Sequence, residues 1–259
     1  MLSKIRRIRL VDILPVLSVG CVLLFWIMVA KSNDSLAGPI DTYNRLVELT
    51  KHSLMGTPLW GHVWASLRRI LISFVLASIV GVSLGVAFGV LPTFRRIMWP
   101  VFSIIRPIPP LAWIPIVVLW CGVAGDTSKE VIIFIGIVMA IVINTFEGIK
   151  STDELLLKAA SSLGANRWQM LFDVTIPNSI PVIFAGMKAG LSTGWMSLVA
   201  AEMIAAKEGL GFLINMSMKT VPDTALDLVG IILIAISSAG LTILLNVIER
   251  RLCPWLHLK

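Results

Sequence analysis

The sequence predicts an all-α membrane protein with six transmembrane helices and a cytoplasmic loop, containing a short coupling helix, between the fourth and the fifth. Of the 259 residues, 57% are hydrophobic and only 14% are charged, and the mean hydropathy is +0.90. Soluble domains have about 45–50% apolar and about 25% charged residues, so an entirely soluble protein is excluded. The third observation is that the apolar residues gather in stretches of about 20, the length of a helix that crosses a bilayer.

These apolar stretches define the predicted spans. They are residues 11–30, 70–91, 99–120, 131–149, 182–206 and 228–248. The second carries no charged residue, whereas the third contains Arg106 and five prolines, which predict a stiff and irregular entry to that helix. We expect the first span to be retained rather than cleaved as a signal peptide, because Lys31 stands where a small-residue cleavage site would fall.

Basic residues are unevenly divided between the two sets of connecting segments. If the N-terminus is cytoplasmic, the segments on that side hold more than half of the 22 Lys and Arg residues, while the opposite segments are nearly balanced in charge. Basic residues accumulate on the cytoplasmic side of membrane proteins. The predicted cytoplasmic segments are therefore residues 1–10, 92–98, 150–181 and 249–259, with Arg106 counted at the inner end of the third span. We expect residues 31–69 outside, with an amphipathic helix capped by Asp41, and a core over residues 70–255. The basic balance follows from topology and gives no reason to expect a nucleic-acid partner.

The loop 150–181 is the longest polar insertion between spans. Its second half reads KAASSLGANRWQMLFDVTIPNSIP, from Lys158 to Pro181. Its Ala and Leu residues favour helix, Gly164 predicts the end of a first helical run, and Pro177 and Pro181 predict the start of another. This composition disfavours a disordered linker. A helix lying on the lipid surface and a helix that docks on a soluble partner both remain open.

The residue pattern of this loop resembles the coupling loop of ABC import permeases. It has Ala159 and Ala160, three further residues, then Gly164, and it ends on Ile-x-x-x-x-Pro at 176–181. The loops of that family usually open with Glu-Ala-Ala. Lys158 stands in place of the Glu, so a salt bridge made by that acid is not carried over.

Two further segments strengthen the resemblance. Residues 106–129 and 194–214 are similar to the branch of these permeases that serves taurine, aliphatic sulfonates, nitrate and bicarbonate, with the taurine permeases nearest. The likeness runs over about residues 60–255. It implies a type I ABC importer permease fold, a homodimer, and a place in the bacterial cytoplasmic (inner) membrane.

The resemblance also implies partners and a site. Two ATP-binding subunits would grip the short helix near 162–172, and an extracytoplasmic solute-binding protein would deliver the solute. ATP and Mg²⁺ would be bound by the partner ATPase, since the chain lacks a G-x-x-x-x-G-K-[ST] loop, and the chain itself would not be an enzyme. The predicted ATPase-coupling residues are Lys158, Ala159, Ala160, Gly164, Ala165, Asn166, Arg167, Trp168, Pro177 and Pro181. Trp168 would anchor in the ATPase groove or lie at the lipid headgroups.

The solute implied by the resemblance is small and anionic or zwitterionic. Taurine or another alkanesulfonate is the first choice, and nitrate, bicarbonate or a thiamine-precursor-like solute stay open. The alternative is a secondary transporter or channel that works without an ATPase partner.

Two series of glycines recur at intervals of four residues within predicted spans. They are Gly81, Gly85 and Gly89 in the second span, and Gly186, Gly190 and Gly194 in the fifth. Such small-residue faces let helices approach closely in lipid, so we expect tight helix contacts within the chain or across a dimer.

Polar residues of the fifth span are candidates for the translocation pathway. They are Ser192, Thr193, Trp195, Ser197 and Glu202. Gly190–Gly194 also matches the G-x-S-x-G motif of serine hydrolases, but that motif needs a strand-to-helix turn. We expect none of the three histidines within a span, so a membrane hydrolase is disfavoured.

The remaining charges near predicted spans have simpler expected roles. We expect Lys188 to extend to the surface, Glu202 to pair with Lys207 or a lipid-side donor, and Arg106 to anchor at the inner surface. Arg68 and Arg69 would draw an anion toward the outer mouth or bind lipid phosphate. The scattered cysteines and histidines show no metal-site or disulfide spacing.

Overall fold

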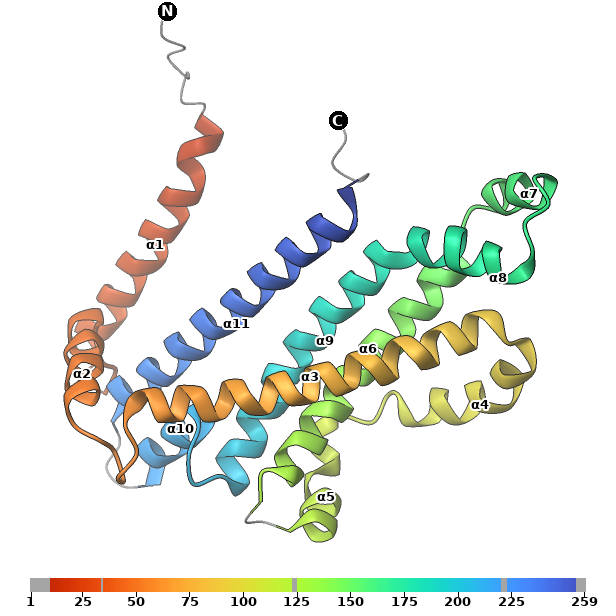
Figure 1. Cartoon of the computed structure of the whole chain (residues 1–259). Helices are drawn as coiled ribbons and strands as arrows, with labels where there is room; N and C mark the ends of the chain where they lie inside the picture. The colour runs from red at the N-terminus through yellow and green to blue at the C-terminus, as the bar shows by residue number, and fades with distance from the viewer. Residues whose placement is uncertain (1–9, 34, 123–124, 220–222, 255–259) are drawn as a thin grey trace, which may run out of the picture.

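The computed structural model describes residues 10–33, 35–122, 125–219 and 223–254, and the secondary-structure elements in these ranges are helices (Figure 1). In chain order they are α1 (Leu10–Ser32), α2 (Pro39–Lys51), α3 (Leu59–Val90), α4 (Pro92–Ile105), η1 (Pro110–Trp113), α5 (Ile114–Cys121), α6 (Thr127–Lys150), α7 (Glu154–Ser162), α8 (Arg167–Gln169), η2 (Met170–Thr175), α9 (Ile176–Ala205), α10 (Leu210–Lys219) and α11 (Thr224–Leu252). The predicted all-α class is confirmed.

Four of the described helices are long and apolar enough to cross a membrane. They are α3, α6, α11 and the continuous run Arg167–Ala205, which joins α8, η2 and α9. A fifth crossing results if α4 and the η1–α5 pair count as one broken span, and the described apolar part of α1 is shorter, Leu17–Ser32. Six straight spans are therefore not confirmed.

The predicted third span, over residues 99–120, is not one straight helix. The chain forms two helical pieces there, Pro92–Ile105 and Pro110–Cys121, bent by 88°. Pro107, Pro109 and Pro110 fall at the break, where three residues in four positions lack the N–H that a continuing helix would need. The prolines thus break the helix rather than merely stiffening its entry.

Two other helices begin earlier than predicted. α3 starts at Leu59 rather than at residue 70, because its polar first turns find polar partners inside the protein. The helix ending in α9 runs from Arg167, although Pro177 and Pro181 were expected to start a separate helical run. A π-helical turn, η2, directly precedes Pro177, and such turns accommodate local breaks in the helical hydrogen-bond ladder.

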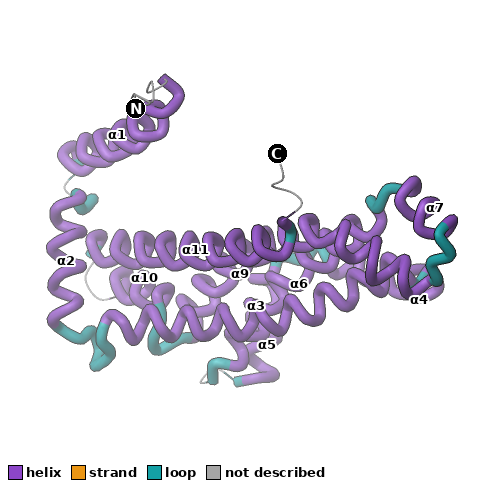
Figure 2. The backbone as a smooth tube through the Cα atoms, turned by 45° about the horizontal axis from the view of Figure 1, so that its top comes forward, coloured by secondary structure: helices purple, strands orange, loops and turns teal. Residues whose placement is uncertain are grey.

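The helix α6 forms the centre of the bundle, between α3 and α9 (Figures 1 and 2). The two glycine series face it. A Cβ added at Gly85 would lie 2.4 Å from Thr145 Cβ, and one at Gly194 would lie 2.7 Å from Ile137 Cγ1. Gly81 and Gly89 face Ile141 and Ile149, and Gly186 and Gly190 face Asn144 and Ile137. The small residues therefore bring both neighbouring helices close to the α6 backbone.

Substitution within this contact should destabilise the bundle. Gly85→Val is expected to cost about 1–3 kcal/mol, because the added atoms overlap Thr145 and the Val142 carbonyl oxygen. Gly240→Val in α11 is the control, since no atom lies within 4 Å of its added Cβ. Unfolding by SDS titration in mixed micelles measures both. Equal stability of the two variants would contradict the close packing of α3 on α6.

The remaining elements pack at one end of the bundle or stand apart from it. The predicted amphipathic helix exists as α2, but Asp41 is its third residue rather than its cap, and its carboxylate accepts the Gly38 N–H. Buried Leu49 joins Leu210, Leu213, Leu226 and Val229 in a cluster with α10 and α11. In Figures 1 and 2, α1 stands apart from the other long helices.

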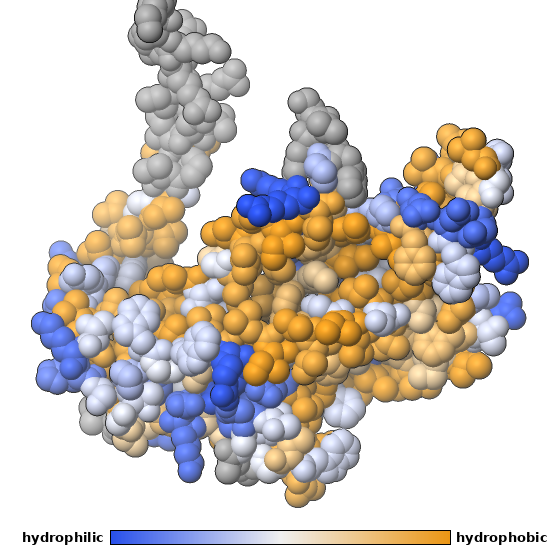
Figure 3. Space-filling model, in the orientation of Figure 1, coloured by the Kyte–Doolittle hydropathy of each residue, from blue (hydrophilic) through white to orange (hydrophobic). Residues whose placement is uncertain are grey.

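The surface fits a protein solvated by lipid. Figure 3 shows a broad apolar surface over the middle of the bundle, with hydrophilic residues gathered toward both ends of the helices. Large apolar side chains such as Leu119, Ile79 and Ile231 are exposed. An aqueous protein rarely leaves so much contiguous apolar area uncovered.

Candidate functional site

The helices α7 and α8 and the turn between them form a two-helix corner that projects from one end of the bundle (Figure 1). This corner contains most of the predicted coupling residues. Its first helix, α7, begins where the Asp153 carboxylate accepts the Leu155 N–H. It ends at Ser162, and Gly164, two residues further on, has φ +84° in the left-handed region. The Gly164 N–H bonds to the Ser161 carbonyl and the Ala165 N–H to the Ala160 carbonyl. This pair of bonds is a Schellman motif, which fixes the direction of the chain after the helix.

The second helix of the corner is capped just as firmly. The Asn166 side-chain oxygen accepts the N–H groups of Trp168 and Gln169, at 3.0 and 2.9 Å. The Gln169 side-chain oxygen accepts the Asn166 N–H at 2.8 Å. This reciprocal capping box starts the helix that continues to Ala205. The corner is therefore joined rigidly to a helix of the bundle core.

Apolar side chains cover the tip of the corner. Leu163 is 89% exposed and Trp168 70% exposed, and Trp168 stacks on Phe172 with ring centroids 6.1 Å apart. Lys158 pairs with Glu154 at 3.3 Å on the exposed face of α7, an interaction that contributes little stability. Of the other predicted coupling residues, the exposed ones are Ala159, Gly164, Asn166 and Arg167, and the half-buried ones are Ala160, Ala165, Pro177 and Pro181.

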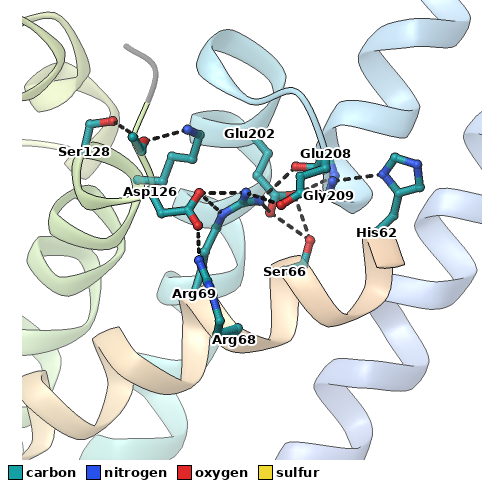
Figure 4. Close-up of polar contacts among 12 residues, drawn as sticks. His62, Ser66, Arg68, Arg69, Asp126, Ser128, Glu202, Glu208 and Gly209 are labelled. Carbon is teal, nitrogen blue, oxygen red and sulfur yellow. Dashed lines mark hydrogen bonds and ion pairs between the residues drawn. The ribbon is translucent and has the colours of Figure 1, made fainter. Parts of the chain in front are cut away.

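A buried ion-pair network lies at the opposite end of the bundle (Figure 4). Its centre is Arg69 of α3, which is 2% exposed. The Arg69 guanidinium contacts the Glu202 carboxylate at 2.7 Å and the Asp126 carboxylate at 2.8 Å. It also donates to the Glu208 carbonyl oxygen at 2.8 Å. One side chain thus joins α3, the start of α6, the end of α9 and the turn that follows α9.

The fully buried Glu202 closes that turn onto α3. Its carboxylate accepts the Ser66 hydroxyl at 2.8 Å and the Gly211 N–H at 2.9 Å. His62 Nδ1 accepts the Gly209 N–H at 3.1 Å. Gly209 has φ +127°, and a Cβ there would lie 2.4 Å from the Glu202 carboxylate carbon. Only glycine fits at position 209, because any side chain there would overlap the Glu202 carboxylate.

This network corrects two predictions from the sequence. Glu202 pairs with Arg69 and not with Lys207, and Arg68 and Arg69 bind Asp126 rather than facing only lipid or solute. Burial opposes the ionisation of Asp126, but the two guanidinium groups outweigh it and hold the pKa of Asp126 below its usual range. Opposite charges at the outer ends of two predicted spans were the signal that could have revealed the pair.

The candidate pathway residues are scattered. Thr193 borders a cavity of about 340 Å³, and its hydroxyl donates to the Gly136 carbonyl at 2.7 Å. Ser192 is exposed and donates to the Lys188 carbonyl. Trp195 and Ser197 are buried in helix contacts, and Glu202 is buried in the network.

Two more expectations need correction. His62 lies within the long apolar helix α3, contrary to the prediction that no histidine would fall in a span. It contacts Gly209 and not Ser192, and Gly190–Gly194 is continuous helix, so the geometry of a hydrolase is not present. Lys188 pairs with Glu249 of α11 at 2.5 Å instead of extending freely to the surface.

The part of the chain that the structure describes contains no group of three or more His, Cys, Asp or Glu residues able to hold a metal ion.

Known proteins match this arrangement over most of the chain. Residues 74–256 match the family described as binding-protein-dependent transport system inner membrane component. The taurine transport system permease protein TauC of Escherichia coli is 41% identical over 201 residues, which are 78% of this chain and 72% of that protein. The nitrate import permease protein NrtB of Synechocystis is 30% identical over 228 residues, 84% and 82% of the two chains.

The fold also matches a solved transporter. The inward-facing MetNI methionine ABC transporter aligns with a TM-score of 0.64 and 18% identity, over 74% of this chain and 94% of the chain compared. The type I importer permease fold and the resemblance predicted from the sequence are thus confirmed, and relatives of this kind are transport subunits rather than enzymes. The chain belongs to the family of binding-protein-dependent transport system inner membrane components, as a multi-pass permease subunit of an ABC importer.

Proposed function

We propose that the chain forms, with a second copy of itself, the translocation pathway for a small anionic or zwitterionic solute, with taurine or another alkanesulfonate as the first choice. The 41% identity to a taurine permease supports this cargo class. Two ATPase subunits bind the two-helix corner, and a solute-binding protein docks at the opposite end of the bundle. ATP and Mg²⁺ are bound by the ATPase subunits.

The observation that carries the coupling proposal is the exposed apolar tip of the corner. Leu163, Trp168 and Phe172 project from a segment whose backbone is fixed by a Schellman motif and a capping box. Such a rigid tip suits a groove on a soluble partner, where a large aromatic residue contributes much of the binding energy. Because the helix from Arg167 continues to Ala205, closure of the ATPase subunits would tilt α9 and open the pathway to alternate sides.

The proposed orientation places the corner and both termini in the cytoplasm. The start of α1, the end of α11 and the corner lie toward the same side in Figure 1, which supports this topology. The Arg69 network then lies at the extracytoplasmic face. There it holds the α9–α10 turn as a firm surface beside a cavity of about 730 Å³ that Lys129 and Lys207 also line.

Removal of the aromatic anchor tests the proposal. In proteoliposomes containing the chain, its ATPase subunits and its binding protein, Trp168→Ala is expected to lower ATP-driven uptake of radiolabelled taurine at least about tenfold. Trp120→Ala is the control, since Trp120 is comparably exposed, at 76%, but lies in α5 away from the corner.

Two results would count against the proposal. Uptake by wild-type chain without the ATPase subunits would favour a secondary transporter or channel. Full ATP-driven uptake by Trp168→Ala would remove the corner from the coupling path.

A further inference from the structure

A cavity of about 340 Å³ opens where the helix break meets the bundle core. Arg106, at the end of α4, lines it from one side, and α6 and α9 line it from the other. Most of its lining is apolar, from residues such as Ile108, Trp113 and Met139. Apart from the Trp113 indole, the hydrogen-bonding side chains that line it are those of Arg106, Asn144 and Thr193. A mostly apolar cavity with a few polar groups is typical of a small-molecule site.

The cavity lies at the middle of the membrane-spanning helices. On α6 it is lined by residues between Ile135 and Asn144, whereas α6 runs from Thr127 to Lys150. Arg106 therefore lies beside the centre of α6, whereas an anchor at the inner surface was expected from the sequence. Charged residues at this depth are costly, and they usually face a pathway or a partner.

Arg106 has no protein counter-ion among the described residues. Its guanidinium makes no ion pair or hydrogen bond within that part of the chain. Two cations of the bundle core differ in this respect: Arg69 contacts three carboxylate-bearing residues, and Lys188 pairs with Glu249. The charge of Arg106 is thus available to an anion from outside the described protein.

The other polar groups complement a zwitterion. The Asn144 amide nitrogen donates to the Ala140 carbonyl at 2.9 Å, which leaves the amide oxygen free to accept a hydrogen bond from an ammonium group. Pro107, Pro109 and Pro110 hold the break rigidly. Broken helices near the bilayer midplane are places where transporters bind solutes.

We propose that Arg106 binds the anionic group of the transported solute, a small sulfonate or carboxylate, at the midpoint of its passage. The cavity volume of about 340 Å³ is in the range of small-molecule sites. This inference rests on the proposed function, in which the chain forms the pathway of an importer. It assigns solute recognition to the permease itself, in addition to the binding protein.

The first test is direct binding to the permease alone. Saturation-transfer NMR with ethanesulfonate is performed on the full chain in nanodiscs, with the neutral isostere ethyl methyl sulfone as the comparison probe. Arg106→Gln is expected to weaken ethanesulfonate binding about tenfold or more, since a charged hydrogen-bond partner is lost, and Arg106→Lys to retain most of it. Arg96→Gln, on the same helix but outside the cavity, should bind as wild type.

The second test uses the complete transporter in proteoliposomes. Arg106→Gln should lower taurine uptake per ATP hydrolysed about tenfold, whereas ATPase activity stimulated by the loaded binding protein should stay within about twofold. A merely structural role would lower both. Wild-type binding and uptake by Arg106→Gln, or equal binding of the sulfone and the sulfonate, would overturn the inference. If ethanesulfonate binding depends on Arg106 but wild type shows no ATP-driven uptake, the site stands and the proposed function fails.

Discussion

Arg69→Met is expected to destabilise the folded chain by about 3–5 kcal/mol, because it leaves a buried carboxylate without its counter-ion. Glu202 is fully buried, and after the substitution only Ser66 and the Gly211 N–H would remain to stabilise its charge. Asp126 would keep only the half-exposed Arg68. The loss of a shared cation should therefore loosen α3, the start of α6 and the α9–α10 turn together.

A neighbouring arginine provides the matched control. The Arg68 side chain is 49% exposed and pairs with Asp126 alone, so Arg68→Met should cost no more than about 1 kcal/mol. SDS titration in mixed micelles gives the unfolding free energy of each variant. A cost for Arg69→Met as small as that for Arg68→Met would mean that the buried network does not hold this end of the bundle.

The double variant separates the pair from its surroundings. Replacing Arg69 and Glu202 together by methionine removes both charges, and such replacements are often much less costly than removing one partner. We therefore expect Arg69→Met/Glu202→Met to be more stable than Arg69→Met. If the losses of unfolding free energy in Arg69→Met and Glu202→Met simply add in the double variant, the interaction between the two side chains is not what stabilises the turn.

Much of the fold was predictable because lipid imposes a simple rule on sequence. Every backbone polar group in the bilayer must be bonded within the protein, so apolar stretches of sufficient length predict helices. The glycine series in α3 and α9 likewise marked the faces that contact α6. These features depend on local composition and spacing, which a single sequence displays.

The break in the third predicted span has a local cause that composition alone obscured. Hydropathy sums residues 99–120 as one apolar stretch, yet three prolines within four positions make one continuous helix impossible there. The chain turns by 88° at the break, and this turn brings Arg106 to the cavity at mid-depth. The proline cluster, given its full weight, would have placed the break correctly.

The Arg69 network was missed because its members are far apart in the sequence. Ser66, Arg69, Asp126, Glu202 and Gly211 meet only when α3, α6 and α9 pack together. Each residue taken alone is compatible with contacts to lipid headgroups or water at a membrane surface. Pairing depends on tertiary contacts, and neither periodicity nor spacing within one helix contains that information.

The corner was better predicted, since its geometry is specified locally. Gly164 was expected to end a helix, and it does so in the left-handed conformation that glycine adopts most readily. The capping box at Asn166 and Gln169 is also readable from neighbouring residues. What the sequence could not show is that the second helix continues through Pro177 and Pro181 into α9.

That continuity leads to the largest expected functional effect, the loss of coupling in Gly164→Pro. Proline fixes φ near about −65°, whereas Gly164 has φ +84°, and proline also removes the N–H that bonds to the Ser161 carbonyl. The corner should lose its fixed direction while α6 and α9 keep their packing. ATP-driven taurine uptake is then expected to fall more than about tenfold, with ATP hydrolysis no longer linked to transport.

Gly122→Pro is the matched control for this substitution. Gly122 has φ +83°, its N–H bonds to the Val118 carbonyl at a helix end, and no atom lies within 4 Å of an added Cβ. The local strain is therefore similar, but the position follows α5 and is remote from the corner. If both variants lose uptake to the same degree, backbone strain anywhere in the chain suffices and the corner has no special part in coupling. If only Gly164→Pro loses it, while membrane insertion and ATPase binding persist, the force that moves α9 passes through the turn at Gly164.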